Sequence, residues 1–221
     1  MAFAHNNFLT EHCLYQDDDI LVINKPAGVL TIPGKGDLID SVLTRLQAIE
    51  PRTLLIHRLD RDTSGILVFA LNKAAQSHIS KQFQARTTEK FYQAILSGHL
   101  STHLPQQGTI DIPVVYDASR PPLHIVDANE KKPAVTHWQV LQEFELNGLA
   151  VTRVEFKPIT GRSHQLRVHS QYLGHAIVGD TLYADENYRR ISPVLCLHAQ
   201  RLRFVHPRTN EEIQFESQPA F

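Results

Sequence analysis

The run 57-HRLDRDTSG-65 concentrates charge between two segments that belong in a core. LLI (54–56) precedes it, and ILVFAL (66–71) follows it. A carboxylate beside such apolar segments must be paired or hydrogen-bonded, since burying it alone is costly. Asp60 is therefore either part of a charged surface turn held by local hydrogen bonds and ion pairs, or an ionised nucleophile or base in a partly dry cleft.

A second charged element is 161-GRSHQLRVH-169, which we expect to open a helix. Arg162 would lie at the N-terminal end of this helix, where the helix dipole is also positive, and such an end suits a phosphate or a carboxylate. His164 and Arg167 are three residues apart on the same helix. The alternative is a solvated basic helix face, and the pattern by itself does not separate the two.

The composition is that of an ordinary globular protein. The chain has 221 residues, of which 42% are hydrophobic and 20% charged. This length allows one large domain or two small ones with a sizeable core. No apolar run approaches the roughly 20 residues that span a bilayer, and the N-terminus lacks a basic start followed by an apolar stretch. We therefore expect a cytoplasmic protein without a membrane partner.

Cysteine and histidine give no sign of a metal centre. The two cysteines, Cys13 and Cys196, form no C-x-x-C pair, and Cys196 lies in the apolar run PVLCLHA, typical of a buried small side chain. The 13 histidines include no H-E-x-x-H or close His/Cys cluster. We expect no metal site.

The overall net charge of -1 hides a gradient along the chain. Residues 1–50 carry three Lys or Arg against seven acids, whereas residues 151–210 carry nine against four. One face can therefore be basic although the whole is neutral. A polyanionic partner is compatible with this distribution, but indiscriminate binding of nucleic acid is not favoured.

Hydrophobic periodicity and turn signals predict strands in hairpins with only a few helices. Asn72 is a suitable N-cap for a helix, and Asn147-Gly148 is a strong hairpin signal. The pattern predicts α+β architecture with a mainly antiparallel sheet in one domain, residues 1–221. The expected strands are 20–26, 66–71, 90–98, 134–144, 149–157 and 195–206; the expected helices are 37–50, 72–86 and 160–175; and 99–133 is expected to form short strands and exposed loops.

Several stretches, taken in order, resemble the RluA family of RNA pseudouridine synthases. The similarity extends over nearly the whole chain and is carried by VINKPAGVLTIP (22–33), HRLDRDTSG (57–65), EKFYQAILSG (89–98), GRSHQLRVH (161–169), LGHAIVGDTLYA (173–184) and LCLHAQRLRFVHP (195–207). The resemblance implies the pseudouridine synthase fold, with helices flanking a central sheet and a cleft that carries a catalytic aspartate. Many members have an N-terminal S4 RNA-binding domain; here the first motif starts near residue 20, so we expect none.

The resemblance also implies a reaction. Uracil is cut from C1′ of its ribose, turned, and rejoined through C5, without a cofactor or net redox change. The short length, DIPVVYD (111–117) and KPITGRSHQLRVH (157–169) are most similar to the member that acts on both large-subunit ribosomal RNA and transfer RNA. We expect an RNA substrate of one or both kinds and, with no coiled-coil pattern, a monomer.

Three residues match the family's catalytic positions. Asp60 matches the catalytic aspartate, which either attacks C1′ or removes a proton from C2′. Tyr92 matches the tyrosine that packs against the target base and assists proton removal at C5. Arg167 matches the arginine that pairs with the catalytic carboxylate, a pairing that would keep Asp60 ionised and oriented.

Further residues are candidates for RNA binding. The uridine has to leave its stack, as with other enzymes that modify bases, and Arg58 could stabilise the vacated space. Arg162 and His164 could contact anionic substrate. Leu166 could wall the pocket, although a core position explains it equally well, and Lys25 could reach phosphate or simply be solvated.

The residues are also compatible with other classes of function. His57, Ser64 and Asp60 or Asp62 supply the residue types of a hydrolase triad, but no G-x-S-x-G elbow exists. Asp60 and Asp62 could form a glycosidase pair only if their loop bends. A non-catalytic RNA-binding module is the remaining alternative, and it gains nothing from presenting a carboxylate to phosphate.

Overall fold

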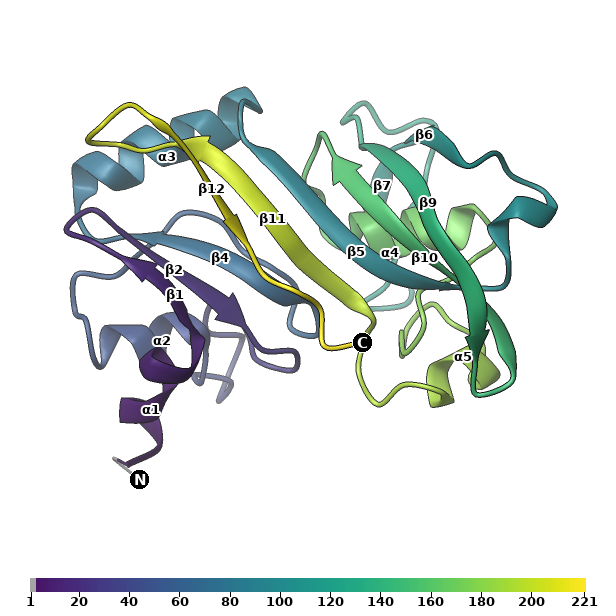
Figure 1. Cartoon of the computed structure of the whole chain (residues 1–221), viewed down its shortest axis with the longest axis horizontal. Coiled ribbons are helices and arrows are strands. Elements are labelled where there is room, and N and C mark those ends of the chain that lie inside the picture. The colour runs from purple at the N-terminus through teal and green to yellow at the C-terminus, as the bar shows by residue number, and fades with distance from the viewer. Residues whose placement is uncertain (1–2) are drawn as a thin grey trace. The chain divides into compact units, whose positions relative to one another are not determined.

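A computed structural model of the protein describes residues 3–221, and this part of the chain divides into two compact units. Unit 1 contains the described residues up to Glu89 together with 199–220, and unit 2 contains 90–198 with Phe221 (Figure 1). Each unit has its own antiparallel strands and its own buried apolar side chains.

Unit 1 is built around two strands that are buried on both faces, β2 (Ile20–Lys25) and β4 (Ser64–Ala70). Strands covered on both faces read as continuous apolar runs, which is why 20-ILVI-23 and 66-ILVFA-70 show no polar alternation. The strand order is β1 (Cys13–Gln16), β2, β4, β11 (Leu197–Val205), with β3 (Leu54–Leu55) on β4 and β12 (Glu212–Glu216) on β11. The pairs β1–β2, β2–β4, β3–β4 and β11–β12 are antiparallel.

Helix α3 (Lys73–Ala85) begins where the sequence predicts. The Asn72 side chain accepts a hydrogen bond from the Ala75 N–H at 2.9 Å, so the predicted N-cap is confirmed. Ile79 then packs with Ile20 and Val68 in one buried cluster.

The helix predicted over 37–50 is much shorter, and this prediction was wrong at its start. Helix α2 spans Val42–Gln47, after Ser41, whose hydroxyl and backbone N–H both bond to Thr44 in a capping box. Leu38 and Ile39 remain 62% and 70% exposed. The periodic apolar spacing included Leu38, but the cap at Ser41 starts the helix at Val42, four residues after Leu38. Helix α1 (Phe3–His12), which the sequence did not indicate, contacts α2 and β2.

Unit 2 contains an antiparallel sheet in the order β5 (Glu89–Ser97), β10 (Leu149–Pro158), β9 (Val135–Leu146), β6 (Gln107–Asp111). The hairpin predicted at Asn147-Gly148 is confirmed, since both residues have positive φ, +50° and +77°. The region 99–133 forms loops and short elements as predicted: the 3-10 helix Leu100–Thr102, β6, β7 (Val114–Tyr116) and β8 (His124–Val126).

Helix α4 (Gln165–Tyr172) carries the second charged motif of the sequence, and α5 (Glu186–Arg190) follows it. Leu166 of α4 joins Trp138 and Phe156 in the core of unit 2. Gly174, at φ +86°, follows the C-cap Leu173 as the C′ residue of the helix. The predicted α+β class with mainly antiparallel strands and few helices is confirmed. Within residues 3–221, no helix is both long and apolar enough to cross a membrane.

Candidate active site

The loop that carries Asp60 connects β3 to β4 in unit 1 and is fixed by a buried threonine. The Thr31 hydroxyl accepts a hydrogen bond from the Leu59 N–H at 3.1 Å and donates one to the Leu59 carbonyl at 2.8 Å. The Thr63 N–H donates to the Asp60 carbonyl at 3.2 Å and closes a turn. The half-buried Asp60 side chain therefore extends from a backbone that is held on both sides.

Lys25 is a second support of this loop, and its position corrects the expected contact with phosphate. The side chain has no exposed surface, and Nζ donates to three carbonyls, those of Pro26 (2.8 Å), Val29 (2.7 Å) and Arg61 (2.8 Å). Burial lowers the pKa of Lys25 to about 8, against the opposing effect of Asp62 and Asp60. Its ammonium therefore cross-links the turn after β2 to the loop that carries Asp60.

Gly65 allows β4 to start immediately after the loop. Its φ is +113°, and a Cβ at this position would lie 2.3 Å from the Ala199 carbonyl oxygen and 2.5 Å from the Ala199 nitrogen. Only glycine allows this approach to β11, so the last residue of the motif is required by packing.

The position of His57 argues against the hydrolase alternative, in which this histidine would act as the general base. The His57 ring stacks on Phe83 of α3 at 4.6 Å between centroids, and its Nε2 accepts a hydrogen bond from the Val68 N–H at 3.3 Å. The lone pair that would activate Ser64 is used inside the fold.

Of the other charged residues of the loop, the two arginines are exposed and Asp62 is half-buried. Arg58 is exposed, as its predicted role requires. Arg61 binds both carboxylate oxygens of Asp62, at 2.9 and 3.3 Å. A glycosidase would need Asp62 to face substrate beside Asp60, and this ion pair occupies it instead.

Tyr92 lies in β5 of unit 2, opposite Phe156 of β10. It is half-buried and packs against the core cluster that contains Ala94 and Leu96, the next residues on the same face of the strand. An aromatic ring at the border of a core offers a flat apolar surface with a polar hydroxyl, which suits packing against a base.

Arg167 is buried with a carboxylate that sequence reasoning missed. Arg167 and Asp180 are 3% and 0% exposed, and Asp180 accepts from Nε at 2.8 Å and from Nη2 at 2.6 Å. Asp180 also accepts from the backbone N–H groups of Leu182 and Tyr183. Its presence in LGHAIVGDTLYA was the available signal, because a buried arginine requires an anionic partner.

Tyr183 and His164 complete the surroundings of Arg167. The guanidinium carbon lies 5.1 Å from the centre of the Tyr183 ring, and the Tyr183 hydroxyl is 2.7 Å from His164 Nδ1. Arg162, in contrast, precedes α4 and donates from Nε to the Pro133 carbonyl at 3.2 Å. Leu166 is 7% exposed and belongs to the core, which favours its structural interpretation.

The predicted residues therefore fall into two groups. Asp60, Arg58 and Lys25 belong to unit 1, whereas Tyr92 and the Arg167 cluster belong to unit 2. The pairing of Arg167 with Asp60 stays a prediction.

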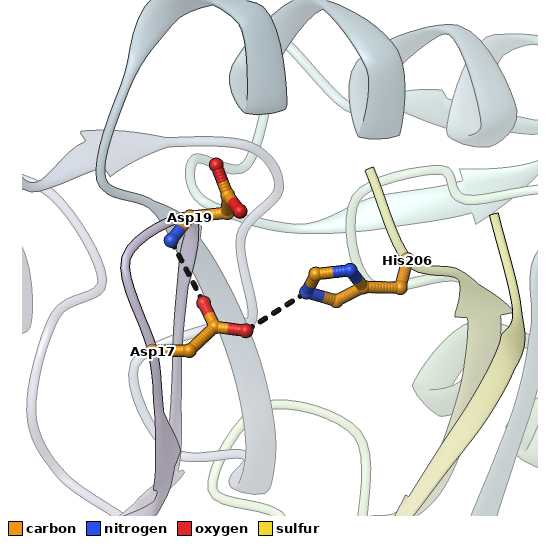
Figure 2. Close-up of side chains that lie close together, drawn as sticks. All are labelled: Asp17, Asp19 and His206. Carbon is orange, nitrogen blue, oxygen red and sulfur yellow. Dashed lines mark hydrogen bonds and ion pairs between the residues drawn. The ribbon is translucent and has the colours of Figure 1, made fainter. Parts of the chain in front are cut away.

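One cluster in unit 1 has metal-ligand chemistry: Asp17, Asp19 and His206 offer atoms within 4.8 Å of one another. Figure 2 shows the Asp17 carboxylate between the Asp19 N–H, at 2.8 Å, and the His206 ring, at 2.9 Å. Asp19 is already bound by Asn72 at 2.7 Å and by the Arg208 guanidinium at 2.5 Å. The Arg208 guanidinium therefore supplies the positive charge that a metal ion would bring to this cluster. We interpret the cluster as a clasp, a set of hydrogen bonds and ion pairs that joins the β1–β2 turn to the β11–β12 turn.

The clasp stabilises ionised carboxylates. Burial raises the pKa of Asp17, but hydrogen bonds from the Ile20 and Asp19 N–H groups, the Tyr15 hydroxyl and His206 outweigh it, and the pKa is lowered from its ordinary value. The pKa of Asp19 is lowered in the same way, with burial opposed by Arg208 and Asn72.

Comparison with known sequences identifies the family. The sequence profile described as RNA pseudouridylate synthase matches residues 19–172. The dual-specificity RNA pseudouridine synthase RluA of Haemophilus ducreyi is 43% identical over 217 residues, covering 98% of this chain and 96% of that protein. The protein of the same name from Escherichia coli strain K12 is 44% identical over 209 residues, covering 94% of this chain and 93% of that protein.

Comparison with solved structures identifies the same family. Human RNA pseudouridylate synthase domain containing 1 superposes with a TM-score of 0.81 at 32% identity, covering 95% of this chain and 84% of that one. Human RNA pseudouridylate synthase domain containing 4 superposes with a TM-score of 0.75 at 28% identity, covering 99% of this chain and 94% of that one. The resemblance carried by the sequence motifs is thereby confirmed, and the chain belongs to the RNA pseudouridylate synthase family, enzymes that isomerise uridine in RNA to pseudouridine.

Proposed function

We propose that this enzyme modifies specific uridines in both large-subunit ribosomal RNA and transfer RNA, with Asp60 as its catalytic carboxylate. The dual-specificity relatives align with it almost from end to end, which supports the two substrates. The observation that carries the assignment of Asp60 is the support of its loop by buried Lys25 and Thr31. A positioned carboxylate needs such a fixed backbone, because misplacement by about 1 Å can cost roughly a hundredfold in rate.

The reaction needs a carboxylate, an oriented donor and a surface for the base. The N1–C1′ bond breaks, uracil turns, and a C5–C1′ bond forms; C5 loses a proton and N1 gains one, so atoms and electrons balance without a cofactor. Asp60 either attacks C1′ or removes the C2′ proton. Arg167 orients Asp60, while Tyr92 packs against the base and assists removal of the C5 proton.

We further propose that both units act as one catalytic domain in a cytoplasmic monomer. The family profile runs from unit 1 into unit 2, and the proposed catalytic residues are divided between the units. Gel filtration with light scattering tests the monomer, for which a mass near 25.1 kDa is expected.

The decisive experiment is pseudouridine mapping on transfer RNA and large-subunit ribosomal RNA transcripts with wild type and Asp60→Asn. We expect modification at defined uridines in both RNAs by wild type alone. Modification of only one of the two RNAs would refute dual specificity but would still support the assignment as a pseudouridine synthase. RNA binding without modification of either transcript favours another RNA target or a binding module.

Arg58 gives a sharper prediction about how the uridine leaves its stack. Because an exposed guanidinium can fill the space of an extruded base, Arg58→Ala should lower kcat/KM on folded RNA about tenfold more than on an unstructured oligomer. Arg52→Ala is the matched control, since Arg52 is also exposed and forms a surface ion pair with Glu50. Equal losses on both RNAs by Arg58→Ala exclude this role.

A further inference from the structure

Helix α3 has a solvent face that carries positive charge and no negative charge. No Asp or Glu occurs between Asp62 and Glu89. Lys73 and Lys81 are exposed on α3, eight residues and therefore about 12 Å apart along its axis, and the exposed Arg86 follows as the C-cap. A solvated helix face usually mixes charges of both signs. The face is therefore unusual in a chain with a net charge of -1.

These three cations have no acidic partner within the protein. Ion pairs hold arginines elsewhere, such as Arg45 and Arg203, but within residues 3–221 no ion pair includes Lys73, Lys81 or Arg86. The nearest side-chain acceptor of the Lys73 ammonium is a neutral amide oxygen, at 3.4 Å. The positive charge of this face is therefore available to an anion from outside the chain.

Two of the cations occupy positions at which the stability of the helix would favour other residues. Lys73 is the first residue of α3, where the positive end of the helix dipole favours Asp or Glu and opposes a lysine. Arg86 has a φ of +58°, the left-handed conformation in which Gly or Asn is preferred. Residues that depart from local stability rules are expected at functional sites.

The buried side of α3 fixes this face within the unit that carries Asp60. Gln76 donates from Nε2 to the Leu55 carbonyl at 2.8 Å. The Phe83 ring stacks on the ring of His57, three residues before Asp60, at 4.6 Å between centroids. All of these residues belong to unit 1. An anion bound by α3 is therefore held by the same unit as the proposed catalytic carboxylate.

We propose that the solvent face of α3, defined by Lys73, Lys81 and Arg86, binds the sugar–phosphate backbone of the RNA substrate. Phosphate has the complementary charge, and contacts to it position a nucleic acid without reading its sequence. The exposed residues beside the two lysines include Ala74 and Ser77, whose small side chains leave room for an RNA strand. The inference rests on the RNA substrate of the proposed function and adds a binding surface outside the loop of Asp60.

Filter binding measures the contribution of this face, with Asp60→Asn as the background that prevents turnover. The test variant combines Lys73→Gln, Lys81→Gln and Arg86→Asn and so removes three positive charges; asparagine also tolerates the left-handed conformation. In low salt the dissociation constant of the RNA complex should rise at least about tenfold, and the slope of log K for association against log salt should become less negative by about 2.

The matched control combines Lys35→Gln, Lys131→Gln and Lys132→Gln in the same background. It makes the same change in net charge at exposed lysines outside α3. Its dissociation constant should stay within about threefold of that of the parent, because charges away from a contact act only through the screened overall field. Equal losses of affinity in the two triple variants would overturn the proposal, as would an α3 variant that binds RNA like its parent.

Lys73→Glu separates a role in binding from a role in the fold. Glutamate at the start of α3 complements the helix dipole, so the midpoint of urea unfolding should rise. The affinity for RNA should nevertheless fall about fivefold, because one phosphate contact is replaced by repulsion. A loss of stability together with unchanged affinity would assign Lys73 to the fold and contradict the proposal.

A second RNA separates failure of this inference from failure of the proposed function. Because phosphate contacts carry no sequence information, the α3 variant should lose a similar factor of affinity for an unrelated folded RNA. If the wild-type protein forms no pseudouridine in either transcript, the proposed function fails. The difference in affinity between the α3 variant and its control then still decides whether α3 binds the RNA backbone.

Discussion

At the scale of single residues, Lys25 supplies the hydrogen-bond donor for three backbone carbonyls. Three carbonyls from two segments converge on one ammonium group. Lysine supplies three donors at a single point, which asparagine, glutamine and serine cannot. The motif lysine therefore shapes the loop of Asp60 from within.

Replacement of Lys25 by methionine tests this cross-link. Lys25→Met keeps the approximate length of this fully buried side chain and removes the donor of three partly buried hydrogen bonds, so the free energy of unfolding at pH 7 should fall by about 2–4 kcal/mol. Lys35→Met, at an exposed lysine of the same region, should cost less than about 0.5 kcal/mol. Urea unfolding measures both, and equal small costs contradict the structural role.

The same variant has a pH signature. The pKa of Lys25 is about 8 in the folded chain and ordinarily 10.5, so between these values the native state has released a proton that the unfolded state still binds. The free energy of unfolding of the wild-type protein therefore rises with pH across that window. The difference in the free energy of unfolding between wild type and Lys25→Met should widen by roughly 2 kcal/mol between pH 7 and pH 10. A gap that stays constant argues against a lowered pKa.

Gly65 and Gly36 form a matched pair that separates backbone strain from crowding. Both have positive φ, but a Cβ on Gly36 meets nothing within 4 Å, whereas one on Gly65 collides with the Ala199 backbone. Gly36→Ala should cost about 1 kcal/mol. Gly65→Ala should cost at least about 2 kcal/mol more and reduce activity, since strand and loop must shift. Similar midpoints for the two variants in urea would show that the approach to β11 is dispensable.

At the scale of elements, local caps and long-range clasps set where each strand and helix begins. Asn72 caps α3 and also donates to Asp19 at the turn before β2, so one side chain starts a helix and anchors a turn. The capping box of Ser41 and Thr44 likewise outweighs the apolar spacing that suggested a longer α2. Ends of elements thus follow hydrogen bonding more closely than periodicity does.

The clasp of Figure 2 predicts an acid-sensitive contribution to stability. Asp17→Asn should lower the free energy of unfolding by about 1–3 kcal/mol at pH 7, because the hydrogen bonds to a carboxylate are lost or weakened. The folded pKa of Asp17 lies below its ordinary value of 3.8, so this contribution is present above 3.8 and disappears as the pH falls through the folded pKa.

The difference in the free energy of unfolding between wild type and Asp17→Asn should therefore shrink as the pH falls below 3.8 and through the lower folded pKa of Asp17. Asp18→Asn is the control: Asp18 is 78% exposed in the same turn, and its pair with Arg208 should contribute less than about 0.5 kcal/mol. A difference independent of pH would assign the loss to packing and not to charge.

At the scale of the whole molecule, an enzyme with net charge -1 has to bind a polyanion through a limited number of cations. Much of the basic charge is already paired internally, as Arg167 is with Asp180 and Arg208 with Asp19. Binding energy should come to a large extent from an extruded base and loop shape.

The salt dependence of binding tests this distribution. With few phosphate contacts, a plot of log K for association of Asp60→Asn with substrate RNA against log salt concentration should have a slope of about -2 to -4. Filter binding between low and moderate salt measures it, with Asp60→Asn used to prevent turnover. A slope steeper than about -6 would require an extensive basic surface.

Features that depend on neighbouring residues could be predicted from the sequence: the apolar strands at 20–23 and 66–70, the cap at Asn72 and the turn at Asn147-Gly148. The order of the motifs was sufficient for the family and for the proposed roles of Asp60 and Arg167. The tertiary structure alone decided which polar groups meet: Lys25 with a carbonyl 36 residues away, Arg167 with Asp180, and His206 with Asp17 across 189 residues. The reason is physical, because a buried charge must find its counterpart wherever the fold brings one, and that choice is made by packing and not by spacing along the chain.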